Sequence, residues 1–180
     1  MFKSKNKTFV ILSLIMLISG FLISGCSQAE VEDPNKTVIQ KVLELQFTGP
    51  DEKFMDLLSN PKYKMVKNGV EENLEFEKYV KEVYGDYFTV SELDVFMRTF
   101  GTTYQFFAYK SGYKLSFKGV TIEQSETISN RYNFTVQVGY QKDGGKEETA
   151  EVEGLVLFST KEEGKIGKFQ YGNDNGLSDS

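Results

Sequence analysis

The first half of the chain places apolar residues at the three- and four-residue spacing of amphipathic helices. This spacing predicts helices between residues 34 and 49, between 50 and 60, over 70–84 and over 91–100. The pattern over 101–112 leaves helix and extended chain both open. The apolar positions behind these predictions are Val38, Ile39, Val42, Leu43, Leu45, Phe54, Leu57, Leu58, Leu74, Phe76, Tyr79, Val80, Val83, Leu93, Phe96, Met97 and Phe100.

The second half alternates with a period of two, which is the spacing of half-buried strands. The clearest strand is predicted around residues 132–141. The preceding segment, 113–126, keeps this alternation until it slips at Gly119, and the slip predicts a bulge that bends the strand. Turn signals at 143–145 and 162–165 lead into two further strands. The sequence therefore predicts a four-stranded antiparallel meander. The side chains on one face of the clearest strand are Tyr132, Phe134, Val136, Val138 and Tyr140.

Helices followed by a bent antiparallel sheet predict an α+β fold, with the N-terminal helices packed on one face of the sheet. The element order, the bend near Gly119 and the hairpin meander resemble the NTF2-like cone fold over residues 36–177. This resemblance implies a fold that hosts isomerases, dehydratases, transport factors and binding modules, so it leaves function open. The chain is expected to fray from Asn173 on, with 178–180 as its tail.

The N-terminal sequence begins with basic residues, continues as an apolar stretch, and ends with two small residues and a cysteine. Three lysines precede an uncharged apolar stretch over 9–23, and Ser24 and Gly25 precede Cys26, the one cysteine of the chain. A helix that spans a bilayer needs about 20 apolar residues, so this shorter stretch indicates a processed targeting segment. A plain secretory signal and an uncleaved N-terminal helix are the alternatives. The lysines are Lys3, Lys5 and Lys7.

The run from Leu22 to Cys26 resembles the signal of a bacterial lipoprotein, and the chain as a whole is similar to small lipoproteins of Gram-positive bacteria. The resemblance implies that residues 1–25 are removed and that Cys26 receives a diacylglyceryl lipid. Two acyl chains on one residue suffice for stable membrane attachment. The mature protein would then sit on the extracytoplasmic face of the cell membrane, with 26–35 as lipidated cysteine and tether.

Removal of the signal leaves an acidic protein. The chain has 21 basic and 26 acidic residues, and loss of three lysines leaves 18 against 26, so the formal net charge falls from −5 to −8. This balance excludes a nucleic-acid partner, which needs a basic footprint. It also argues against a polybasic membrane-binding patch.

Composition also limits the chemistry. The chain has no histidine, and its cysteine is the expected lipidation site, so the common nucleophile–base pairs and histidine zinc sites cannot be built. No glycine-rich loop opens a helix that could hold phosphate. The acidic turn at 173–176 lacks the later ligands of a calcium-binding EF-hand loop. We therefore expect no cofactor and no metal.

Two groups of side chains remain as candidate sites. The first is a set of carboxylates that could act as a general base beside a tyrosine; the other interpretation is a solvated strand face. The second is an aromatic run that could line a ligand pocket; the other interpretation is core packing. The carboxylates are Glu123, Glu126, Glu151 and Glu153, and the aromatic run is Tyr104, Phe106, Phe107 and Tyr109, followed by Tyr113.

These patterns favour a membrane-anchored binding module of the cell envelope over an enzyme. It would engage a neighbouring envelope protein or a small apolar ligand. The alternative is a carboxylate-based isomerase or hydrolase of the NTF2-like superfamily. A homodimer through the open face of the sheet, where Leu155 and Leu157 lie among acidic residues, is also compatible with the pattern.

Overall fold

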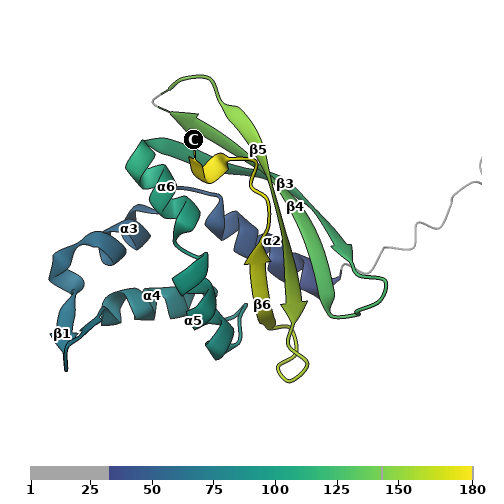
Figure 1. The fold of residues 1–180 in the computed structure, drawn as a ribbon, viewed down its shortest axis with the longest axis horizontal. Coiled ribbons are helices and arrows are strands. Elements are labelled where there is room, and N and C mark those ends of the chain that lie inside the picture. Colours follow the sequence, from purple (N-terminus) through teal and green to yellow (C-terminus); the bar gives the residue numbers. More distant parts are fainter. Residues whose placement is uncertain (1–32, 143, 180) are drawn as a thin grey trace, which may run out of the picture. The chain divides into compact units, whose positions relative to one another are not determined.

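The computed structural model describes residues 33–142 and 144–179. These residues belong to one compact unit, Asp33–Ser180. The predicted signal, Cys26 and the tether up to Glu32 lie outside the described residues. Within the described part, no helix combines the length and the hydropathy needed to cross a membrane. The predicted α+β class is confirmed: helices come first and an open four-stranded antiparallel sheet follows (Figure 1).

Side-chain caps start most of the helices. Asp33, Asp51, Asn73 and Thr89 each accept a hydrogen bond from a backbone N–H in the first turn of the helix that follows. The helices are α2 (Pro34–Gln46), α3 (Glu52–Ser59), α4 (Leu74–Tyr84), α5 (Val90–Thr99) and α6 (Thr103–Ser111). Short 3₁₀ helices occupy Pro61–Tyr63 and Leu177–Asp179.

The structure corrects two predicted boundaries. The tether was predicted to reach Asn35, but α2 already begins at Pro34, because Asp33 caps it and proline suits the first helical position. The third helix was predicted from Val70, but Val70 belongs to a β-hairpin of β1 (Met65–Lys67) and β2 (Val70–Glu72). Its turn residues, Asn68 and Gly69, both have positive φ, which a two-residue hairpin turn requires.

The segment 101–112, for which the pattern left two alternatives, forms helix α6. Gly112 ends it in the left-handed conformation at φ 72°, where glycine carries no steric penalty. Gln105 on this helix is buried and donates to the carbonyl oxygens of Leu45, Gln46 and Thr48 at 3.0–3.2 Å. The helix thereby fixes the chain that leaves α2.

The sheet is a meander in the order β3-β4-β5-β6. The register between β3 and β4 shifts between Phe117 and Gly119, so the predicted bulge is confirmed. Helices cover one face of the sheet (Figure 1). Mostly polar side chains line the other face of β4 and β5. The strands are β3 (Tyr113–Gln124), β4 (Arg131–Lys142), β5 (Glu148–Phe158) and β6 (Ile166–Tyr171).

The core lies between the helices and the sheet, and aromatic rings fill its centre. Phe96 from α5 packs against Phe169 of β6 at 5.0 Å between ring centroids, and Phe47, after α2, lies 4.7 Å from Tyr104. The chain end also joins this core. Leu177 is buried, so the expected fraying from Asn173 on is wrong, and 178 and 179 belong to a 3₁₀ helix.

Candidate functional site

An open apolar concavity lies in the corner between α4 and α5, and we call it the helical cup. Its volume is about 510 Å³. Val80 and Phe88 are buried at its floor, and Val90, at its mouth, is 84% exposed. An open, mostly apolar concavity of this size is typical of a ligand or partner site. The lining residues are Leu58, Phe76, Glu77, Val80, Lys81, Gly85, Phe88, Val90, Leu93, Asp94, Met97, Arg98 and Thr102.

Contacts with neighbouring elements hold the corner of the cup. Asn73 caps α4 and donates to the carbonyl oxygen of Leu57 at 2.7 Å, which ties α4 to α3. The loop between α4 and α5 pairs with the edge strand β6, because the N–H of Thr89 donates to Ile166 O at 3.0 Å and the N–H of Ile166 donates to Tyr87 O at 2.7 Å. The edge strand of the sheet therefore holds the loop that joins the two helices of the cup.

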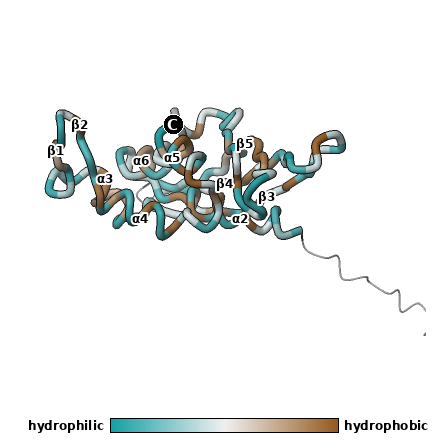
Figure 2. The backbone as a smooth tube through the Cα atoms, turned by 90° about the horizontal axis from the view of Figure 1, so that it is seen from below, coloured by the Kyte–Doolittle hydropathy of each residue, from teal (hydrophilic) through white to brown (hydrophobic). Residues whose placement is uncertain are grey.

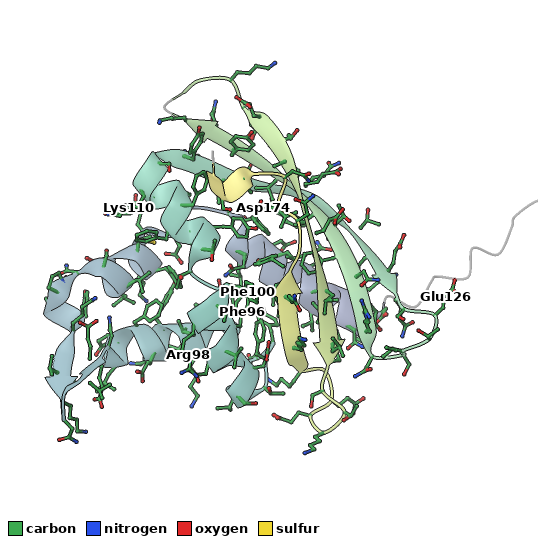
Figure 3. All side chains as sticks on the ribbon, viewed as in Figure 1. Phe96, Arg98, Phe100, Lys110, Glu126 and Asp174 are labelled. Carbon is green, nitrogen blue, oxygen red and sulfur yellow. The ribbon has the colours of Figure 1, made fainter. Side chains whose placement is uncertain are left out.

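The rim of the cup carries both signs of charge. Glu77 and Lys81 stand one turn apart on α4, and neither side chain forms an ion pair with the residues that the structure describes. On α5, Asp94 pairs with Arg98 across one turn, and Figure 3 shows Arg98 on the side of α5 away from the sheet. The rim thus offers one acid and one base without partners.

The predicted aromatic cluster does not form a single lining, because its four members lie on different faces of α6. Tyr104 and Phe107 point into the core and are buried. Phe106 and Tyr109 are 43% and 51% exposed. Tyr109 contributes with Tyr113 to a smaller concavity of about 300 Å³ at the start of β3. Tyr104 and Phe107 therefore contribute to core packing, which was the other interpretation of the aromatic run.

The predicted carboxylates are spread over the surface. All four glutamates, Glu123, Glu126, Glu151 and Glu153, are exposed. Figure 3 places Glu126 at the far tip of the loop between β3 and β4. Their arrangement provides no enclosed general base.

Part-buried carboxylate–tyrosine contacts occur elsewhere, where the aspartates also cap a helix and a turn. The Tyr79 hydroxyl donates to Asp51 Oδ2 at 2.5 Å, while Asp51 Oδ1 caps α3. Burial, followed by the Asp51 contact, raises the pKa of Tyr79 to about 12. Asp174 likewise accepts from Tyr104 at 3.4 Å and from two N–H groups of its own turn. Neither aspartate lines the helical cup.

Sequence reasoning missed a polar centre inside the core. Gln46 on α2 donates to the hydroxyl of Tyr84 at 2.9 Å and to Gly101 O at 3.2 Å. Its Oε1 atom and the hydroxyl of Tyr171 are both buried, and neither has a hydrogen-bond partner. A glutamine in the apolar stripe of a predicted helix was the available signal for this centre.

No metal centre accompanies these features in the described part of the chain, where no three acidic or cysteine side chains gather to hold an ion. The turn at 173–176 instead satisfies its own backbone through Asn173 and Asp174.

Comparison with known proteins finds no match: no family model, no curated protein and no solved structure is significantly similar to this chain.

Proposed function

We propose that this protein is a non-catalytic binding module of the cell envelope, held at the extracytoplasmic face of the membrane by a lipid on Cys26. In this proposal the helical cup receives an apolar group, either a small apolar ligand or an apolar part of a neighbouring envelope protein. The observation that carries the proposal is the cup itself: an open apolar concavity with Val90 exposed at its mouth. Exposed apolar surface that gathers around a concavity marks a binding site more often than scattered residues do.

Membership of the NTF2-like superfamily is part of the same proposal. The order of elements, the bulged first strand of the sheet and the helices on one face support it. No observation favours the carboxylate-based alternative, because the predicted glutamates are exposed and the part-buried Asp51 and Asp174 cap a helix and a turn.

Binding of an apolar fluorescent probe, anilinonaphthalene sulfonate, tests the cup. We expect the probe to bind the folded protein at one site. Met97→Gln, which puts an amide into the wall of the cup, should weaken binding by about tenfold, the loss expected for one buried thioether side chain.

Val95→Gln is the matched control, because Val95 lies on the same helix, is 46% exposed and is not part of the cup lining. Circular dichroism of both variants checks that the fold is kept. Equal probe affinity for the two variants, or no binding to the wild-type protein at concentrations where it is monomeric, would contradict the proposed site.

A further inference from the structure

The hairpin of β1 and β2 exposes apolar side chains that nothing in the described part of the chain covers. Met65, Val66 and Val70 are 48%, 76% and 62% exposed. The Asn68-Gly69 turn holds the two strands in a defined shape. The hairpin lies at the end of the described unit opposite the start of α2 (Figures 1 and 2). The register pairs Met65 with Glu72 and Lys67 with Val70, so Met65 and Val70 share one face of the hairpin and Val66 lies on the other. The face with Met65 and Val70 is the one that suits insertion into an apolar concavity.

The charges of the hairpin complement those of the helical cup. Lys62 and Lys64 already pair with Asp56 and Glu71. Lys67, next to the turn, and Glu72, at the base of the hairpin, form no ion pair with described residues. The rim of the cup likewise carries an unpaired acid and an unpaired base on α4.

We infer that the chain self-associates, with the hairpin of one copy seated in the helical cup of another. The inference rests on the proposed function, because it names the occupant of the cup. β2 leads through Asn73 directly into α4, which forms one wall of the cup. Figure 1 shows the hairpin beyond the N-terminal end of α4, whereas α5, the other wall, follows the C-terminal end. The apolar side chains of the hairpin therefore reach a cup on a second copy.

Pairing of identical hairpin edges is disfavoured by charge. Two β1 edges paired antiparallel about Met65 and Val66 would set Lys64 against Lys67 of the other copy, and two β2 edges paired about Glu71 and Glu72 would set these two acids against each other. Like charges directly across a strand pair are destabilising. Seating the hairpin in the cup instead lets Lys67 approach Glu77. Since each copy has one hairpin and one cup, a two-fold exchange closes a dimer.

The mass of the mature chain from Cys26 on, with Cys26→Ser in place of the lipidated residue, tests this inference by light scattering across protein concentration. We expect a concentration-dependent dimer that weakens as salt rises, because salt screens the rim charges. The double variant Met65→Ser, Val70→Ser should weaken the dimer roughly tenfold or more, since it removes two apolar side chains from the same face of the hairpin. Val90→Lys, at the cup mouth, should do the same by repelling the lysine-bearing hairpin.

Two control variants and a mixture of two variants make the test specific to the hairpin and the cup. Val95→Lys on α5 and Ile128→Ser in a loop are exposed substitutions outside hairpin and cup, and both should dimerise like the wild-type chain. An equimolar mixture of the hairpin variant and the Val90→Lys variant should form more dimer than either alone, because one intact hairpin meets one intact cup. A monomer at all concentrations, or a dimer that both variants leave unchanged, overturns the inference.

Failure of this inference can be separated from failure of the proposed function. If the wild-type chain is monomeric but the cup still binds anilinonaphthalene sulfonate, the cup is a binding site with another occupant, and self-association is wrong. If the probe does not bind the monomeric hairpin variant either, the proposed function fails with it.

Discussion

Tyr171 shows how one residue can lower the stability of the core that it fills. Its ring packs against Tyr104 at 5.1 Å and Phe169 at 5.0 Å between centroids. Its hydroxyl is buried without a hydrogen-bond partner, and burial holds its pKa well above the ordinary value of 10.0. A buried donor without a partner costs roughly 1–3 kcal/mol in desolvation. The ring therefore stabilises this core while the hydroxyl destabilises it.

We expect Tyr171→Phe to raise the free energy of unfolding by about 1 kcal/mol, because it keeps the ring and removes the unpaired hydroxyl. Tyr84→Phe is the matched control: its hydroxyl accepts a hydrogen bond from Gln46, so its loss should lower stability by about the same amount. Urea denaturation measures both. A loss of stability in Tyr171→Phe would show that its hydroxyl has a partner.

At the scale of elements, one carboxylate joins α5 to the edge of the sheet. Glu92 lies in the first turn of α5, is buried, and accepts the N–H of Phe169 on β6 at 2.7 Å. Burial raises the pKa of this carboxyl above its ordinary value of 4.5, and the hydrogen bond from Phe169 opposes the rise without cancelling it. The contact helps to hold the helix that forms one wall of the cup.

The raised pKa makes this contact depend on pH. Between the ordinary and the raised pKa, the folded state binds more protons than the unfolded state, so stability falls as pH rises through that window. Glu92→Gln keeps an oxygen for Phe169 but cannot ionise. We expect its stability relative to the wild-type protein to increase from about pH 4 upwards, measured by urea midpoints. A difference that stays constant with pH would show that Glu92 has the same pKa folded and unfolded.

At the scale of the whole molecule, the proposed function combines a lipid anchor on Cys26 with a folded domain that begins at Asp33. Among the described residues, the buried hydrophobic core runs from Ile39 to Leu177. Six residues lie between Cys26 and Asp33, and the seven Cα–Cα steps that join them reach about 24 Å at most, which would keep the domain near the membrane surface.

Intact mass of the protein extracted from its own membranes tests the anchor. We expect a mature chain that begins at Cys26 and carries a diacylglyceryl group, and we expect Cys26→Ala to lose the lipid. An unmodified thiol on Cys26 of the mature wild-type chain would contradict lipid attachment, and the binding site would then need another route to the cell surface.

Local periodicity predicted much of the fold, since alternation over 132–141 and the slip at Gly119 correspond to β4 and to the bulge in β3. The hairpin was missed although its Asn68-Gly69 signal is present in the sequence, because Val70 also fits the helical spacing of α4. Helix α6 was left open because it buries polar Gln105 and exposes Phe106, which blurs its pattern.

The sequence by itself determined four of the helices, the four-stranded meander that follows them, the bend of the sheet and the acidic balance of the chain, because periodicity, turn residues and charge are local properties. Only the tertiary structure decided which apolar surfaces stay uncovered. The helical cup depends on α4 and α5 meeting at a corner that Ile166, far along the chain, holds in place. Burial is set by packing between such distant segments, and no local pattern of residues records it.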